Sequence, residues 1–202
     1  IQSHILEKNI VAFALNPVMQ EILVSNKLDG SLNSPPDTSL LASIESNVGI
    51  NKANKAVTRN INLEKTASTY VLAINWTHDG SYKSTEVPST AYVNYHRIFT
   101  DPDWQVESIL IQGKSVLPEH QRIITTKNGD SYLETGFLVV VPEFENVTAA
   151  ITLSSSTQKP LYFIKQAGIE PFELLFSQNI SGKQEISTFL ISQNTILPNS
   201  TP

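Results

Sequence analysis

From about residue 56 onward apolar and polar residues alternate along the chain, and this alternation restricts the fold more than any other feature. One face of residues 57–64 carries Val57, Arg59, Ile61 and Leu63, and the other carries Thr58, Asn60, Asn62 and Glu64. In residues 70–76 one face carries Tyr70, Leu72, Ile74 and Trp76. Because successive side chains of a strand point to opposite faces of a sheet, the pattern predicts half-buried strands.

Further segments of this kind follow at short intervals, separated by Gly, Pro, Asn and Asp. We predict strands over residues 92–99, 105–111, 122–126, 135–141, 147–153, 161–166, 172–177 and 185–192. About ten strands at this spacing indicate two packed sheets. The predicted fold is therefore mainly β, an antiparallel immunoglobulin-like β-sandwich over residues 55–192, followed by a polar tail over residues 193–202.

The first 54 residues have a different character. An apolar run over residues 10–15 predicts a buried strand, and Asn16-Pro17 predicts a helix start with Asn as N-cap and Pro in the first helical position. Apolar residues at helical spacing extend the helix to about Asn26, and residues 40–46 fit another strand. The 202 residues fit one large sandwich or one domain plus part of another. The change favours the second alternative, in which residues 1–54 are the C-terminal end of an α/β domain whose body lies upstream.

Composition points to a compartment outside the cytoplasm. Only 16% of the residues are charged, against an average of about 25%, and Ser, Thr and Asn take their place. The net charge of -5 comes without a basic run, which argues against nucleic acid as a partner. There is no Cys for a disulfide or a thiolate metal site. No apolar run is long enough to span a bilayer, so we expect membrane attachment only through an anchor upstream.

Several phrases, in chain order, resemble one bacterial family. The first phrase is residues 4–13, followed by Asn16-Pro17-Val18-Met19-Gln20 and Asp29-Gly30-Ser31-Leu32. Next, residues 43–54 are similar to an "Asn-x-Gly-x-Asn-Lys" signature and precede Val57-Thr58-Arg59, and residues 92–99 are similar to "Tyr-x-Asn-Tyr-x-Arg-Val-Tyr". Finally, Glu134-Thr135-Gly136-Phe137 is similar to "Glu-x-Gly", and residues 163–168 are similar to "Gln-Lys-Gln-Pro-Gly". The sequence departs from this pattern at Ala167, where Pro is usual, and after Phe99.

The chain thus resembles, over residues 1–178, the C-terminal part of an uncharacterised family of membrane-anchored surface proteins from actinobacteria and candidate-phylum bacteria. Its members carry a transmembrane helix, a region similar to the LytR-CpsA-Psr cell-wall phosphotransferases and then a β-rich part. The resemblance implies a cell-surface or cell-envelope location and a domain order. It carries no catalytic residue onto this chain, because the phosphate-binding region of the family lies upstream of the resembling part.

Aromatic residues are densest in residues 92–104. Tyr92, Tyr95 and Trp104 are the candidate contacts for a ligand or partner, since exposed rings stack on sugars or on a peptide strand. Alternation places Tyr92 on one face with His96 and Tyr95 on the other with Phe99, so at least one of these pairs is expected in the core.

We predict no catalytic residue, cofactor or metal. His4, His78, His96 and His120 stand in no motif of a nucleophile and base or of a metal centre, and are interpreted as ordinary strand and surface residues. Asp101 and Asp103, with Asp130, could offer carboxylates to calcium, but their spacing matches no calcium loop. The favoured interpretation is that they make local turn hydrogen bonds.

Three functions stay open. The first is a non-catalytic extracytoplasmic module with a structural, adhesive or cell-wall-associated role, contacting wall polymer or another surface protein. The second is an accessory domain of a wall-polymer phosphotransferase-like enzyme whose active site lies upstream. The third is a filament or surface-layer subunit that assembles by strand addition through residues 185–192. The sequence does not define the oligomeric state.

Overall fold

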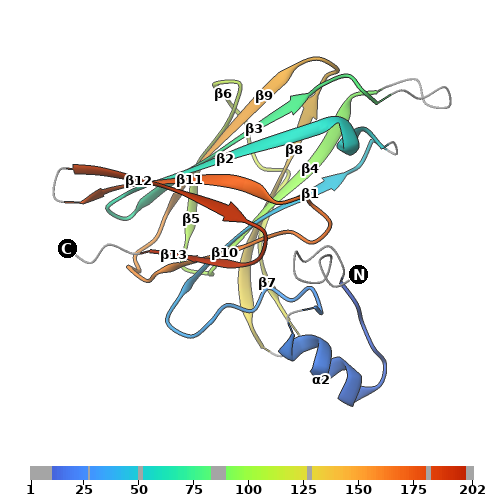
Figure 1. Cartoon of the computed structure of the whole chain (residues 1–202). Coiled ribbons are helices and arrows are strands. Elements are labelled where there is room, and N and C mark those ends of the chain that lie inside the picture. The colour runs from blue at the N-terminus through green and yellow to red at the C-terminus, as the bar shows by residue number, and fades with distance from the viewer. Residues whose placement is uncertain are drawn as a thin grey trace.

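A computed structural model of the chain describes residues 11–26, 28–49, 52–82, 90–126, 129–180 and 183–198. The described residues form two sheets that face each other across a common core, and helix α2 lies apart from them at one end (Figure 1). The prediction of a mainly β fold is confirmed.

The first sheet has six strands in the order β13-β10-β1-β4-β8-β7. These are β13 (Thr195–Leu197), β10 (Leu161–Ile164), β1 (Ser39–Asn47), β4 (Tyr92–Thr100), β8 (Ser131–Val141) and β7 (His120–Thr125). The second has seven strands in the order β12-β11-β2-β3-β9-β5-β6. These are β12 (Lys183–Ile191), β11 (Phe172–Ile180), β2 (Val57–Thr66), β3 (Thr69–His78), β9 (Asn146–Ser154), β5 (Gln105–Ile111) and β6 (Lys114–Ser115), and the short helix η1 (Ala53–Ala56) leads into β2.

Both sheets are mixed rather than antiparallel, and the antiparallel part of the prediction is wrong. Strand β1 pairs parallel with β10, and β2 pairs parallel with β11. The chain reaches β10 beside β1 and then crosses to the other sheet, where β11 runs beside β2. Alternating hydrophobicity is the same in parallel and antiparallel half-buried strands, so the sequence pattern did not distinguish the two directions.

The predicted inner faces are confirmed. In β3, Tyr70, Leu72, Ile74 and Trp76 are all at most 1% exposed, and in β2, Ile61 and Leu63 are buried while Asn60, Asn62 and Glu64 are exposed. Complete burial of one such apolar side chain contributes about 1.5–3 kcal/mol, so this ladder of inward side chains is a principal source of stability. A second, smaller cluster on the outer face of the first sheet contains Leu40, Ala42, Phe99, Tyr132, Tyr162 and Ile164.

The segment before β1 confirms one prediction and corrects another. Helix α2 (Pro17–Ser25) begins where expected, and the Asn16 side chain accepts hydrogen bonds from the amides of Val18 and Met19. The buried strand predicted over residues 10–15 is not formed by residues 11–15, and residue 10 lies outside the described residues. Phe13 and Leu15 are 77% and 91% exposed, because no described element covers them.

Strand β1 belongs to the sandwich rather than to a separate α/β piece. It pairs with β4 over seven residues and with β10 over four, and therefore lies inside the six-stranded sheet. The predicted boundary between residues 54 and 55 thus divides a single sheet. The predicted polar tail also needs correction, since residues 195–197 form β13 against β10 and Leu197 is fully buried.

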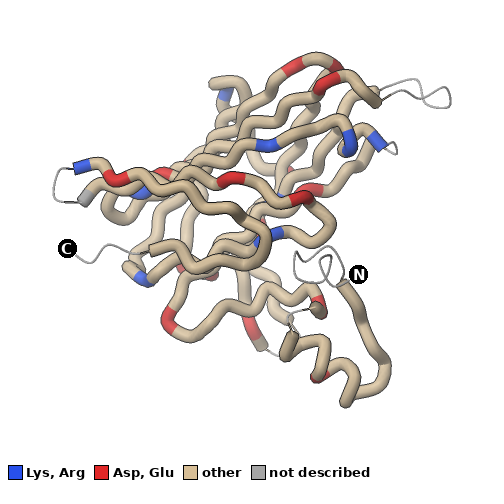
Figure 2. Tube along the Cα trace, in the orientation of Figure 1, with Lys and Arg blue, Asp and Glu red and all other residues tan. Residues whose placement is uncertain are grey.

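Charged residues are spread thinly over the strands of both sheets in the part of the chain that is described (Figure 2). Basic and acidic positions are interspersed along the tube rather than collected on one strand. Among the described helices, none combines the length and the apolar character required to cross a membrane.

Candidate functional site

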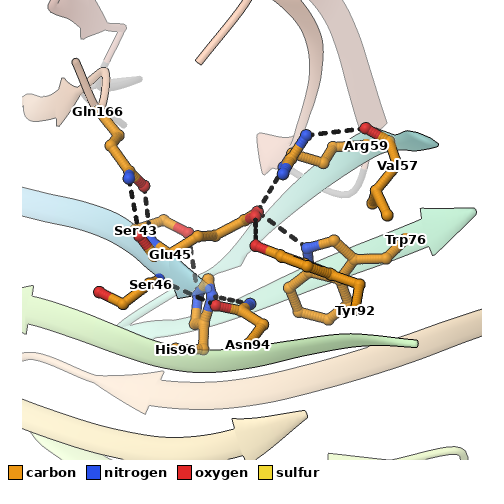
Figure 3. A network of polar contacts seen from close by, with 10 residues as sticks. All are labelled: Ser43, Glu45, Ser46, Val57, Arg59, Trp76, Tyr92, Asn94, His96 and Gln166. Carbon is orange, nitrogen blue, oxygen red and sulfur yellow. Dashed lines mark hydrogen bonds and ion pairs between the residues drawn. The ribbon is translucent and has the colours of Figure 1, made fainter. Parts of the chain in front are cut away.

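A buried carboxylate, Glu45, ties the two sheets together at the end where β2 begins. It lies on the inner face of β1, and its side chain is only 6% exposed. Its Oε1 accepts hydrogen bonds from Arg59 Nε at 2.7 Å and Trp76 Nε1 at 2.8 Å, and its Oε2 accepts one from the Tyr92 hydroxyl at 2.6 Å. Since these donors come from β2, β3 and β4, one carboxylate connects strands of both sheets (Figure 3).

The ion pair keeps this site charged despite its burial. Burial alone would raise the pKa of Glu45, but the Arg59 guanidinium, with further help from the Tyr92 hydroxyl, lowers the pKa below its ordinary value. Burial would lower the pKa of Arg59, and the Glu45 carboxylate raises it instead. Burial and the adjacent carboxylate raise the pKa of Tyr92 well above that of a free phenol. Glu45 and Arg59 are therefore ionised and Tyr92 is a neutral donor at neutral pH.

His96 extends the polar network below Glu45 and is neutral. Its Nδ1 accepts a hydrogen bond from the Asn94 amide at 3.3 Å, so the proton lies on Nε2, which donates to Ser43 Oγ at 3.1 Å. The ring is fully buried and packs edge-on against Trp76, with ring centroids 5.3 Å apart. Burial lowers the pKa of His96 to about 4, so the imidazole is an uncharged structural group rather than an accessible base.

The loop between β10 and β11 is fastened to β1 next to Glu45. The Gln166 side chain accepts from the Glu45 main-chain N–H at 2.5 Å and donates to the Glu45 carbonyl at 2.8 Å, so it replaces a neighbouring strand (Figure 3). Behind it, the fully buried Lys165 donates through Nζ to the carbonyls of Gln166 and Ile169. These bonds give residues 165–169 a fixed course beside the carboxylate.

A groove of about 680 Å³ opens between this loop and the start of β2. It is lined by Asn54, Lys55, Val57, Thr58, Arg59, Gly168, Ile169, Glu170, Pro171 and Phe172. Arg59 connects the groove to the buried network, because its side chain is 12% exposed and binds Glu45 on its inner side. A groove with both polar and apolar lining residues therefore lies against the buried network, in which the charges of Glu45 and Arg59 balance each other.

The aromatic residues proposed as ligand contacts do not form an exposed set. Tyr92 and Trp104 are 1% and 2% exposed, so this prediction is wrong for both. Tyr92 donates to Glu45, and Trp104 stacks on Tyr70 with ring centroids 4.8 Å apart, because both face the core. Tyr95 alone is partly accessible, on the outer face of β4, where its hydroxyl bonds to His120 Nδ1.

Two of the phrases that carried the family resemblance, residues 92–99 and 134–137, meet on that outer face. Glu134 binds Arg122 at 2.8 Å and lies 3.6 Å from Arg97 and 3.4 Å from His120 Nε2. Gly136 lies directly beneath the Tyr95 and His120 side chains, where a Cβ would clash with both. The "Tyr-x-Arg" and "Glu-x-Gly" phrases thus come together through the β4–β8 register. The family assignment itself stays a prediction.

The other histidines and the aspartates have local partners. His4 lies outside the described residues. His78 is buried, accepts from the Gly80 amide through Nδ1 and donates through Nε2 to the Thr90 carbonyl. Asp101 accepts from the Leu40 amide at 3.1 Å and shares a cavity of about 350 Å³ with Asp130, which Asp103 does not line. Among the described residues no three His, Cys, Asp or Glu side chains gather in a metal-binding geometry.

Sequence reasoning missed Glu45, Arg59 and Gln166. One signal was present, since Arg59 shares the inward face of β2 with Ile61 and Leu63. A charge on an apolar face needs an opposite charge nearby, because an isolated buried ion is very unfavourable. The position of its partner, on a strand whose neighbours were unknown, was not readable from the sequence.

No protein-family model matches the chain, and no curated protein matches it. Among solved structures, one similar chain is a "putative nutrient binding protein" from Legionella pneumophila, with a TM-score of 0.37 and 8% sequence identity. The match covers 68% of this chain and 54% of that one, so it spans about half of the neighbour's length.

Proposed function

We propose that the chain is a non-catalytic, extracytoplasmic module of a bacterial cell surface that binds wall polymer or another surface protein through the groove at the start of β2. The observation that carries the proposal is that the Glu45 carboxylate is fully engaged in hydrogen bonds within the protein. Its two oxygens are occupied by Arg59, Trp76 and Tyr92, so the carboxylate supports the groove wall instead of facing a substrate.

Two further observations support this role. The groove is bordered by main chain held through Gln166, and a preformed site loses less conformational entropy on binding than a mobile one. The exposed strand positions are rich in neutral polar residues, and only 16% of the chain is charged, as expected of a surface β-domain.

Two measurements test the proposal. Antibodies against the folded chain should label intact producing cells, and labelling that requires prior opening of the cells would contradict the location. Purified cell wall or surface protein extract should then retain the chain, and Lys55→Glu in the groove should weaken retention. Lys52→Glu is the matched control, because Lys52 is also exposed but lies outside the groove. Equal retention of both variants would contradict the groove as binding site.

A second function, self-assembly by strand addition, is favoured by strand β12. It is the edge of the seven-stranded sheet and pairs with β11 over all nine residues. Ile186 and Leu190 are 58% and 66% exposed on it, and exposed apolar edge strands pair readily with other chains. Light scattering should show concentration-dependent oligomers that Ile186→Lys abolishes. A monomer at every concentration would exclude this mode.

A further inference from the structure

The strand register leaves part of β2 without a neighbour on one side. Pairing with β11 begins at Ile61, opposite Leu174, and continues to Lys65. Residues 57–60 pair with β3 on the other side, but no described strand pairs with them on the side of β11. At about 3.3 Å per residue, this free edge is about 13 Å long. An unpaired edge presents main-chain N–H and C=O groups to an incoming strand, and of these the Val57 carbonyl already accepts a hydrogen bond from Arg59 Nη1 at 3.0 Å.

The groove lies at this free edge. Val57, Thr58 and Arg59 form one side, and residues 168–172, which lead into β11, form the other. The chain could have paired here if β11 had begun at Glu170, which the register would place opposite Val57. Instead, Gln166 holds the preceding loop against β1, Lys165 cross-links that loop internally through the Ile169 carbonyl, and the gap of about 680 Å³ stays open. The gap is therefore a strand-sized vacancy with fixed walls.

The side chains around the vacancy suit a peptide rather than a small ion. Ile169, Pro171 and Phe172 are half-buried and offer apolar contacts, while Lys55 and Glu170 are exposed and of opposite charge. Arg59 is already balanced by Glu45, so Lys55 and Glu170 are the charges that an occupant meets. A peptide with one acidic and one basic residue would complement them, and its main chain would use the free edge.

We infer that this groove binds an extended segment of a partner protein, which adds as a short strand to residues 57–60 of β2. The inference rests on the proposed function and narrows its partner from wall polymer or protein to protein. Recognition is then largely through the main chain, with apolar pockets for alternate side chains.

A displayed library of random heptapeptides, selected on the full chain, provides the probe. Selected peptides should bind the wild-type chain, and Thr58→Trp should weaken binding by about tenfold or more, because the indole fills the groove. The matched control is Thr66→Trp, which alters an exposed threonine at the opposite end of β2 and should leave affinity within about twofold. Hydrogen exchange at residues 57–60 should slow when peptide is bound.

Strand addition makes one further demand on the peptide. N-methylation of every second peptide nitrogen removes main-chain donors without changing the side chains, and it can be done in two series, on the odd or on the even positions. The series that methylates the nitrogens facing β2 should bind about tenfold more weakly than the unmethylated peptide. Equal affinity for both methylated series, equal binding to Thr58→Trp, or failure to select any peptide would overturn the inference. Wall fragments that bind in a Thr58-dependent manner without any selected peptide would overturn it while supporting the proposed function. Peptide binding by a chain that is absent from the surface of intact cells would support the inference and contradict the proposed surface location.

Discussion

Replacement of Glu45 by Ala should destabilise the fold by about 3–5 kcal/mol, the usual cost of removing one partner of a buried ion pair. Three donors lose their acceptor together: the Arg59 guanidinium, the Trp76 indole and the Tyr92 hydroxyl. Arg59 is 12% exposed, so its charge recovers little hydration. The two neutral donors are left without an acceptor as well, and because these costs overlap with that of the broken ion pair, the expected loss lies in the upper half of the range.

The assay is urea unfolding followed by tryptophan fluorescence, with Glu64→Ala as control because Glu64 is an exposed glutamate on β2. The control should change the free energy of unfolding by less than about 0.5 kcal/mol. Arg59→Met and the double variant complete a cycle. Because Arg59→Met alone leaves Glu45 as an unpaired buried charge, the double variant should be more stable than the sum of the single losses predicts, by about 2 kcal/mol. A loss below about 1 kcal/mol for Glu45→Ala, or simple additivity, would refute the reasoning.

Three more predictions concern other parts of the molecule. Burial holds the pKa of His96 at about 4, whereas the unfolded chain has an ordinary histidine pKa of about 6.5. The free energy of unfolding should therefore be intact above pH 6.5 and fall by up to about 3 kcal/mol towards pH 4. Urea unfolding at each pH should show this slope and His96→Gln should reduce it, whereas an unchanged slope in the variant would contradict the assignment. Gly136→Ala should cost about 1–3 kcal/mol in thermal unfolding, because the new methyl group displaces the Tyr95 and His120 rings, and a wild-type melting temperature would contradict this. Asn16→Ala should speed hydrogen exchange in the first turn of α2, while Asn16→Asp, which keeps an acceptor, should not, and equal exchange in the two variants would show that the cap is dispensable.

Local patterns in the sequence predicted most of the strands and their inward faces. Strand β5 was predicted with its observed bounds, and β2, β3 and β4 to within about two residues at each end. Helix α2 was located by its Asn16-Pro17 start. These succeeded because alternation and capping depend on residues close in sequence. The exposed side chains of Val11, Phe13 and Leu15 show the limit, since an apolar segment is buried only if another element covers it.

The candidate site was not predictable in the same way. Tyr92 was expected to contact a ligand, yet its hydroxyl is bound to Glu45, 47 positions away. Gln166 is a polar residue after a strand, and nothing nearby in sequence indicates that it binds the main chain of Glu45, 121 positions away. The groove itself exists because β11 meets β2 only from Ile61 onward, which is a property of register between distant strands.

The sequence by itself therefore determined which segments become strands and which side chains avoid water, because both follow from the period of two along a single strand. Only the tertiary structure decided strand direction, the partners of Glu45 and the free edge of β2. The physical reason is that the free energy of a buried charge, or of an unpaired strand edge, depends on groups that the fold brings beside it from far along the chain.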